Sequence, residues 1–202
     1  MVKAMRITSI LVFVLALGVV ALMGSEPLKI GEPAPDFELK DLNGKSVKLS
    51  DFKGKYVVLE WINPNCPFVV RHYEKDGMGA LQEEIAKNDV VWLTINSTNP
   101  SHKDYETPER LSEIYAKWKS KAASNLMDSD GAVGKKYDAK TTPHMYVIGK
   151  DGKLLYQGAI DDDPRGNKDS RIQYVRAALN EAMKGRKIVN TTTTPYGCSV
   201  KY

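Results

Sequence analysis

The chain has 202 residues, the length of one domain of ordinary size. Apolar residues make up 42% and charged residues 27% of it, which fits a core-forming protein and excludes a largely disordered one. Lys and Arg number 29 against 25 Asp and Glu, an excess too small for a nucleic-acid-binding protein. Two cysteines are too few for a disulfide-rich scaffold or a four-thiolate zinc site.

Residues 1–25 have the layout of an export signal. Lys3 and Arg6 precede an apolar run over residues 7–24, and no acidic residue accompanies them. At about 18 residues the run is also at the short limit for a spanning helix. We therefore expect either a cleaved signal peptide or a membrane anchor, with no other contact to a membrane. Both place the rest of the chain outside the cytoplasm, in the periplasm or secreted, where disulfides persist.

Runs of alternating or β-rich apolar residues predict the strands. Asn43-Gly44 between two alternating segments is a hairpin signal, and Asp151-Gly152 joins a second such pair. Two short apolar runs, one of them opened by Gly54, are typical of buried strands. The predicted strands are 37–40 with 46–49, 56–62, 90–95, and 145–148 with 154–156.

Helical periodicity appears later in the chain. It is carried first by Leu111, Ile114, Tyr115 and Trp118, and then by Ile172, Val175, Leu179 and Met183 ahead of Gly185. Strands that alternate with helices, followed by a late hairpin, predict one mixed α/β domain. Residues 187–202 contain four threonines, a proline and a glycine, and we expect an extended tail there.

The chemistry centres on Cys66, which follows the strand predicted at 56–62. Pro67 is a favoured first helical residue and would place Cys66 at the N-cap of a helix. Unpaired amides and the helix dipole stabilise a thiolate there, the nucleophilic form of cysteine. A buried, inert cysteine is the alternative, but the prolines and asparagines around it are typical of an exposed turn.

Several ordered motifs then make residues 29–202 resemble the redoxin branch of the thioredoxin superfamily, which includes alkyl hydroperoxide reductase/thiol-specific antioxidant proteins. The motifs are Gly31-Glu-Pro-Ala-Pro-Asp-Phe, Asp41-Leu-Asn-Gly-Lys, Leu49-Ser-Asp-Phe-Lys-Gly-Lys, Asn65-Cys-Pro-Phe-Val, Thr141-Thr-Pro-His-Met-Tyr-Val-Ile, Tyr156-Gln-Gly-Ala-Ile-Asp-Asp and Gly197-Cys-Ser-Val-Lys. The resemblance implies a thioredoxin fold with an N-terminal β-hairpin extension, a redoxin domain over residues 29–186 and a C-terminal tail over 187–202 that carries Cys198. It also implies that Thr142-Pro143 is a cis-proline element beside Cys66, with the backbone of Thr142 pairing with a bound disulfide substrate.

Two departures from the family patterns matter. Val69 stands where ordinary thioredoxins have the second cysteine of Cys-x-x-Cys, so no local disulfide can form. Leu59 and Asn63 stand where the peroxidases of the family have Pro and Thr, which removes the hydroxyl expected to hold a peroxide. Cys198 is the available intramolecular partner of Cys66.

Other residues near these motifs are open to two interpretations. Arg71 could raise the local positive potential, or belong to a solvated helix face. His144 could tune the thiolate or shuttle a proton, or be a strand histidine that points elsewhere. Asp161-Asp162-Asp163 lacks the spacing of a calcium loop and is interpreted as a solvated turn.

The sequence therefore predicts an exported thiol–disulfide oxidoreductase in which Cys66 attacks and Cys198 resolves. Its substrate would be a protein or small-molecule disulfide and its electron donor a thiol; no cofactor or metal is expected. A peroxiredoxin-like peroxidase, in which a sulfenic acid at Cys66 condenses with Cys198, is a second hypothesis. A non-enzymatic binding module with a structural Cys66–Cys198 disulfide is a third.

Overall fold

The computed structural model describes residues 28–202. Residues 1–27, which contain the predicted export signal or anchor, lie outside the described residues. Across residues 28–202, no helix combines the length and the apolar character needed to cross a membrane.

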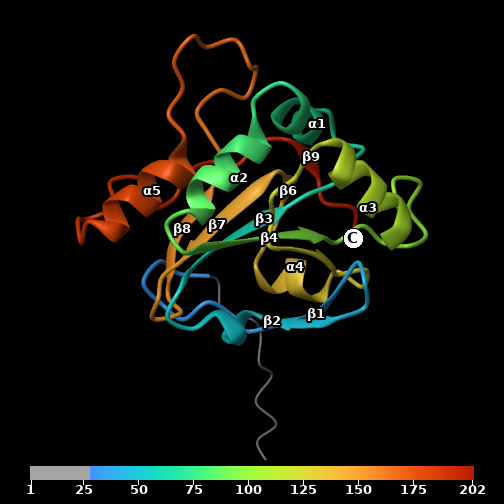
Figure 1. The fold of residues 1–202 in the computed structure, drawn as a ribbon, viewed down its shortest axis with the longest axis horizontal. Coiled ribbons are helices and arrows are strands. Elements are labelled where there is room, and N and C mark those ends of the chain that lie inside the picture. Colours follow the sequence, from blue (N-terminus) through green and yellow to red (C-terminus); the bar gives the residue numbers. More distant parts are fainter. Residues whose placement is uncertain (1–27) are drawn as a thin grey trace, which may run out of the picture.

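Strands and helices alternate along the described chain, as the sequence pattern predicted (Figure 1). The strands are β1 (Glu38–Asp41), β2 (Ser46–Lys48), β3 (Tyr56–Trp61), β4 (Val90–Asn96), β5 (Ser124–Met127), β6 (Thr141–Thr142), β7 (His144–Ile148), β8 (Leu154–Gly158) and β9 (Cys198–Ser199). The helices are η1 (Leu49–Phe52, a 3-10 turn), α1 (Pro67–Glu74), α2 (Met78–Ala86), α3 (Pro108–Lys117), α4 (Ala132–Lys136) and α5 (Tyr174–Met183).

A mixed seven-stranded sheet forms the centre of the domain, in the order β2-β1-β5-β4-β3-β7-β8. β3 runs parallel to β4, and β4 to β5, whereas β7 lies antiparallel to both β3 and β8. The hairpin β1–β2 joins through an antiparallel pairing of β1 with β5. β6 and β9 form a separate two-stranded sheet, so the end of the chain pairs with a segment 56 residues earlier.

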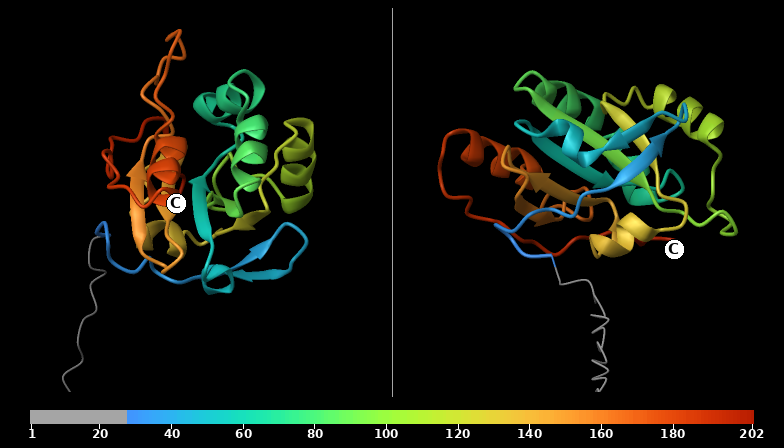
Figure 2. Two further views of the ribbon diagram at one scale, coloured as in Figure 1. Left: turned by 60° about the vertical axis from the view of Figure 1, so that its left-hand side comes forward. Right: turned by 90° about the horizontal axis from the view of Figure 1, so that it is seen from below.

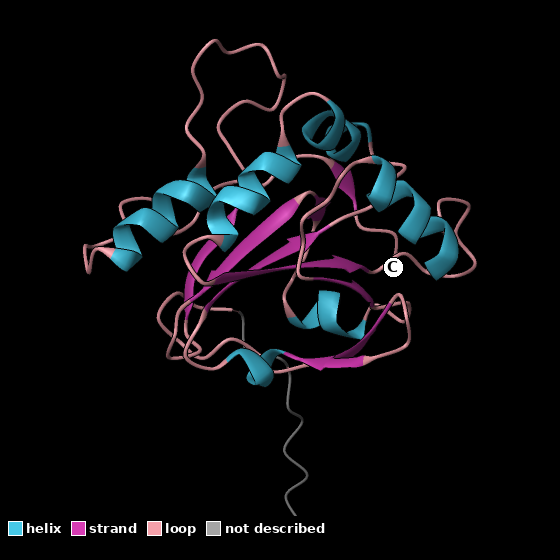
Figure 3. Cartoon of the chain, viewed as in Figure 1, coloured by secondary structure: helices cyan, strands magenta, loops and turns pink. Residues whose placement is uncertain are grey.

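The sheet separates two hydrophobic clusters. The cluster on one face contains Cys66 and takes its helical members from α1, α2, α3 and α5. The cluster on the other face is covered by α4, η1 and the β1–β2 hairpin. Figure 3 shows this division of the helices about the strands, and Figure 2 shows the loop between β8 and α5 projecting beyond the helical layer.

The predicted strands, both hairpins and the helix at α3 are confirmed, while the last helix needs a correction. Ile172 was expected on its buried face, but α5 begins at Tyr174 and the Ile172 side chain is 50% exposed. The periodicity did not predict α2, β5 or α4. β5 begins with two polar residues, Ser124 and Asn125, and α4 is only 5 residues long, so neither carries a readable pattern.

The C-terminal segment is extended, as expected, and it is docked on the domain along its length. The backbone N–H of Gln157 in β8 donates to the Thr191 carbonyl at 3.0 Å, and the Thr193 N–H returns a bond to the Gln157 carbonyl at 3.1 Å. A side chain at Gly158 would collide with Thr193, so glycine is needed for this close approach. The tail therefore follows the edge of β8 before it reaches β6.

One ionisable group, Glu60 of β3, is fully buried in the cluster that contains Cys66. Its Oε2 accepts hydrogen bonds from Tyr73 Oη at 2.9 Å and Trp92 Nε1 at 2.8 Å, whereas Oε1 has no partner. Burial raises the pKa of Glu60 to about 7, because the low-dielectric interior disfavours the charged carboxylate.

We expect Glu60→Gln to change how stability depends on pH. Above the unfolded-state pKa near 4.5 the unfolded chain releases the Glu60 proton while the native state still holds it, so the wild type loses stability as the pH rises toward 7. The loss approaches about 3 kcal/mol and then levels off. The glutamine amide does not titrate, so the variant does not lose stability in this way. The free energy of unfolding of Glu60→Gln relative to wild type should therefore increase from pH 4.5 to 8 in urea titrations. A constant difference across this range would contradict the assignment.

Candidate active site at Cys66 and Cys198

The turn that presents Cys66 is held by asparagine side chains. Asn63 follows β3 and is buried; its Oδ1 accepts from the Asn65 N–H at 2.7 Å and its Nδ2 donates to Thr98 Oγ1 at 3.1 Å. The Asn65 amide donates to the Asp104 carbonyl and to the Glu106 carboxylate. The loop after β4 thus fixes the turn after β3, as expected where neighbouring parallel strands end at the same edge of a sheet.

Cys66 is the N-cap of α1 and Pro67 is its first residue, as predicted. The Cys66 carbonyl accepts the first helical bond, from the Val70 N–H at 3.0 Å. The Cys66 side chain makes no capping hydrogen bond to the helix, and the residue is only 1% exposed. The exposed site expected from the turn is therefore covered in this structure.

The peptide bond between Thr142 and Pro143 is cis, and it lies beside Cys66. The Cys66 thiol donates to the Thr142 carbonyl oxygen, with Sγ and oxygen 2.9 Å apart. Two segments 76 residues apart in the chain are joined here. The structure brings Cys66, Thr142 and Pro143 together in the arrangement that the sequence resemblance implied.

The C-terminal tail places Cys198 next to Thr142, the residue whose carbonyl accepts from the Cys66 thiol. Cys198 of β9 is the antiparallel register partner of Thr142 in β6, and the neighbouring pair is Ser199 with Thr141. Gly197 has φ +137°, and a Cβ there would collide with the Thr142 carbonyl. Only glycine allows so close an approach. Both cysteines are free thiols, so the structure shows their proximity in the reduced form.

The two thiols have opposite pKa shifts. Burial raises the pKa of Cys66, but hydrogen bonding with the Cys198 thiol and with Thr142 outweighs it and leaves the pKa below its ordinary value. Burial, the hydrogen bond with Cys66 and the Cys66 charge raise the pKa of Cys198 to about 11. Cys66 is therefore the thiol that ionises first, and Cys198 is the one that keeps its proton.

Arg71 lies in α1 and turns toward the tail. Its guanidinium binds the Asp76 carboxylate at 3.1 Å and the carbonyls of Pro164 and Asp163, and its side chain is only 16% exposed. The solvated-face interpretation is therefore wrong. Because none of these partners is a sulfur, a direct effect of Arg71 on the thiolate stays a prediction.

His144 matches the alternative in which a strand histidine points elsewhere. It precedes Met145 in β7, and Met145 packs in the cluster that contains Cys66, so alternation along the strand turns His144 to the opposite face. Its Nδ1 lies 3.2 Å from the Lys140 N–H and 3.0 Å from Tyr146 Oη. Burial lowers the pKa of His144 to about 4, so the ring is neutral at physiological pH.

The acidic run at residues 161–163 is a structured turn, which corrects the solvated-turn interpretation. Asp161 and Asp163 are each about 1% exposed. Asp161 Oδ1 accepts from the Asp163 N–H, and Asp163 accepts from the N–H groups of Asn167 and Lys168. Within residues 28–202, no group of three or more His, Cys, Asp or Glu side chains could hold a metal ion.

The sequence pattern assigned no role to Tyr196, marked Gly197 only as a residue that lets the tail turn before Cys198, and gave Asp161 no partner. The available signal was position: Tyr196 and Gly197 directly precede Cys198, and a glycine next to a candidate thiol indicates a close backbone approach. Asp161 carried no such signal, because its partner Tyr196 is 35 residues away.

Comparison with known proteins identifies the family of the chain. The AhpC/TSA family profile matches residues 30–157, and the chain belongs to that family. The thiol-disulfide oxidoreductase ResA of Bacillus thuringiensis is 27% identical over 139 residues, which cover 65% of this chain and 70% of ResA. The peroxiredoxin Bcp of Bacillus subtilis is 51% identical over 43 residues, covering 19% of this chain and 27% of Bcp.

A crystal structure of an uncharacterized conserved protein from Geobacillus kaustophilus extends the similarity to the whole domain. It is 28% identical, covers 87% of this chain and 93% of its own, and superposes with a TM-score of 0.78. The core arrangement of β3, β4, β7 and β8 with helices on both faces is the thioredoxin fold, which confirms the predicted fold class.

We expect Cys198→Ala to raise the pKa of Cys66, because the alanine removes the thiol that hydrogen-bonds to its sulfur. The measurement is the rate of alkylation of Cys66 against pH, with the modified peptide identified by mass spectrometry. Cys198→Ser is the matched control, since its hydroxyl can still donate, and it should shift the midpoint less. Equal midpoints for wild type and Cys198→Ala would show that Cys198 does not stabilise the thiolate.

Proposed function

We propose that this member of the AhpC/TSA family is an exported thiol–disulfide oxidoreductase with Cys66 as nucleophile and Cys198 as resolving cysteine. The observation that carries the proposal is the register pairing of Cys198 with Thr142, whose carbonyl also binds the Cys66 thiol. The similarity to ResA supports the same class of reaction.

The first step is attack by the Cys66 thiolate on one sulfur of a disulfide RS–SR′. The Cys66–SR bond forms, the S–S bond breaks, and R′S⁻ leaves and takes up a proton. Cys66 suits this role because its pKa is the lowered one of the pair. Hydrogen bonding with the Cys198 thiol and with Thr142 lowers this pKa and outweighs the opposing effect of burial.

The second step is attack by Cys198 on the Cys66 sulfur. The Cys66–Cys198 bond forms and RS⁻ leaves with a proton, so the protein loses two electrons and the substrate gains them. The negative charge of Cys66 is one reason that the pKa of Cys198 is raised, and that charge is absent in the mixed disulfide. Forming the mixed disulfide therefore makes Cys198 easier to ionise at the moment when it must attack. A thiol donor reverses both steps to restore the reduced protein.

Access to the site requires movement of the tail. Cys66 is 1% exposed while β9 is docked, so an external disulfide reaches its sulfur only when β9 separates from β6. The edge of Thr142 that β9 occupies is the edge at which the family resemblance places an extended substrate. We infer that the tail and the substrate bind to the backbone of Thr142 alternately, so that one must leave before the other binds.

The peroxidase alternative has less support from the site. The similarity to Bcp favours it, but Asn63 replaces the hydroxyl residue expected to hold a peroxide. Both polar ends of the Asn63 side chain are already used to hold the turn, by Asn65 and Thr98. We therefore expect disulfides to be reduced much faster than hydrogen peroxide.

Export stays part of the proposal, and its support is the sequence of residues 1–25. A reporter fused after Ser25 should be recovered outside the cytoplasm, either free or with the membrane. Recovery of all reporter as soluble cytoplasmic protein would contradict export and leave the redox proposal standing.

Turnover of a protein disulfide by the reduced protein tests the proposed reaction. Cys66→Ser should lose turnover by at least about a hundredfold with an unchanged circular dichroism spectrum, since a serine hydroxyl is a far weaker nucleophile. Cys198→Ser should instead accumulate a mixed disulfide on Cys66, visible by mass spectrometry. The oxidised wild type should contain a Cys66–Cys198 cross-link with a potential above about −300 mV.

Three results would redirect the proposal. Turnover retained by Cys66→Ser would remove this thiol from the mechanism. Faster consumption of hydrogen peroxide than of the disulfide would favour the peroxidase. A Cys66–Cys198 bridge that resists physiological dithiols would support the structural alternative.

A further inference from the structure

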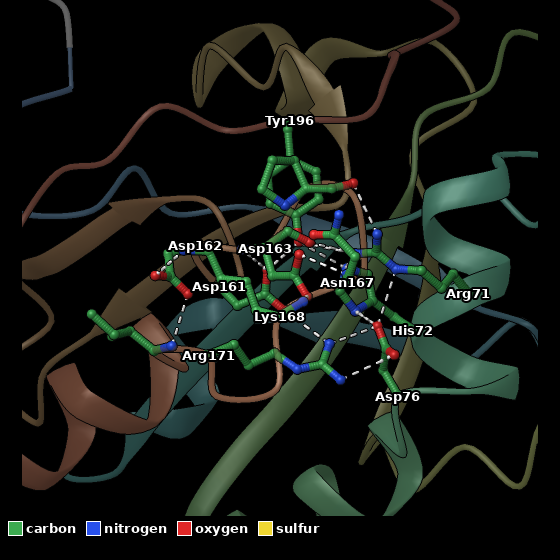
Figure 4. Close-up of polar contacts among 12 residues, drawn as sticks. Arg71, His72, Asp76, Asp161, Asp162, Asp163, Asn167, Lys168, Arg171 and Tyr196 are labelled. Carbon is green, nitrogen blue, oxygen red and sulfur yellow. Dashed lines mark hydrogen bonds and ion pairs between the residues drawn. The ribbon is translucent and has the colours of Figure 1, made fainter.

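Tyr196 lies two residues before Cys198, and its hydroxyl joins the C-terminal tail to a polar cluster made by Arg71, His72, Asp76, Asp161 and Arg171. Figure 4 shows these side chains converging from α1, the segment after it, the loop between β8 and α5, and the tail. None of the proposed redox steps uses them.

The Tyr196 hydroxyl is held by three side chains. It donates to Asp161 Oδ1, it lies 3.1 Å from His72 Nε2, and Arg71 Nη2 donates to it at 3.3 Å. Burial and the Asp161 carboxylate raise the pKa of Tyr196, so the hydroxyl keeps the proton that it donates. A hydrogen bond to a charged acceptor is among the stronger kinds in proteins.

Ion pairs hold the acceptor side of this contact in place. The Asp161 side chain is fully buried, and its Oδ2 lies 3.4 Å from Arg171 Nη1. Asp76 in turn binds Arg171 at 2.8 Å, Arg71 at 3.1 Å and His72 at 3.1 Å. The cluster thus ties the loop before α5 to the helix that begins at Cys66, and the Tyr196 hydroxyl enters it from the tail.

The ring of Tyr196 packs on the same helix. Its centroid lies 5.9 Å from the Phe68 ring and 5.9 Å from the Arg71 guanidinium carbon. Phe68, Arg71 and His72 are three and four residues apart, so they share one face of α1. Cys66 stands at the start of that helix, and Tyr196 therefore docks the tail directly onto the element that carries the nucleophile.

Tyr196 and Cys198 are only two residues apart, so fixing the Tyr196 side chain also restricts the position of the Cys198 sulfur. Alternate residues of an extended chain point to the same side. Gly197, between them, faces the Thr142 carbonyl closely enough that no side chain fits there. With Tyr196 fixed on α1 and Gly197 fixed against Thr142, Cys198 has little freedom to move away from Cys66.

We propose that Tyr196 is a positioning residue for Cys198: its hydroxyl, held by Asp161, sets the effective concentration of the Cys198 thiol at Cys66 and keeps β9 closed over the site. This inference rests on the proposed redox function, and it adds the residue that controls how strongly the Cys66–Cys198 disulfide forms. The tail is also bound beyond Cys198, where the Val200 N–H donates to the Lys140 carbonyl at 3.1 Å and the Tyr202 hydroxyl donates to the Ala139 carbonyl at 2.7 Å. Loss of the Tyr196 hydroxyl should therefore loosen the thiol without releasing the whole tail.

The test compares wild type, Tyr196→Phe and Tyr196→Ala in glutathione buffers. At equilibrium the two protein thiols give two electrons and two protons to glutathione disulfide, which becomes two glutathione molecules. Tyr196→Phe should lower the equilibrium constant for forming the Cys66–Cys198 disulfide from glutathione disulfide by about tenfold. This change corresponds to about 30 mV in the reduction potential of the protein disulfide. Tyr196→Ala, which also loses the ring, should lower it further. Tyr56→Phe is the matched control, because Tyr56 lies at the start of β3, the end far from Cys66, and it should leave the constant unchanged.

A second readout is the alkylation rate of Cys66 in each variant on a Cys198→Ser background, where no disulfide forms. A looser tail should raise this rate in Tyr196→Phe and leave it unchanged in Tyr56→Phe. If wild type forms no Cys66–Cys198 disulfide, the proposed function fails, and this rate alone decides whether Tyr196 holds the tail closed. If wild type forms the disulfide but neither the constant nor the rate changes in Tyr196→Phe, the positioning role is wrong. A lower melting temperature with both readouts unchanged would leave Tyr196 with a structural role only, and would also overturn the proposal.

Discussion

The pairing of β9 with β6 is the constraint on which the site depends. It joins the end of the chain to the residue before the cis-proline, and it places Cys198 opposite Thr142, whose carbonyl already accepts from the Cys66 thiol. Glycine at 197 permits the approach. Because Val69 occupies the position of the second cysteine in a Cys-x-x-Cys motif, this chain brings its second thiol from 132 positions away.

This arrangement has an electrostatic consequence and a steric one. The two thiols share a hydrogen bond, so the pKa of Cys66 is lowered and that of Cys198 is raised, and the order of ionisation follows. Cys66 is buried while β9 is paired with β6, so in the proposed mechanism the same strand affects both the reactivity of Cys66 and access to it. Tyr196 connects the tail to α1 and to the loop before α5 through the hydrogen bonds of its hydroxyl, and ion pairs of Arg171 with Asp76 and Asp161 join that loop to the segment after α1.

Much of the fold could be read from the sequence because the strands and α3 carry strong periodic signals, and Cys66-Pro67 marked the start of α1. Local pattern did not reveal β5 or α4, which are short and partly polar, or the start of α5 after Ile172. The acidic run at residues 161–163 looked solvated because its partners, Arg171 and the N–H groups of its own loop, become apparent only in three dimensions. The tail was expected to be extended, but its composition could not show that backbone pairing with β8 and β6 holds it on the domain.

The pairing of β9 with β6 places the Cys198 thiol within hydrogen-bond reach of the Cys66 thiol in the reduced protein. Titration of the reduced protein with phenylarsine oxide tests this most directly, because trivalent arsenic forms a tight cyclic adduct only when two thiols can reach it together. We expect one arsenical bound per chain, with both cysteines protected from alkylation, and only weak binding by Cys66→Ser or Cys198→Ser. Wild-type binding as weak as that of the single-cysteine variants would contradict it.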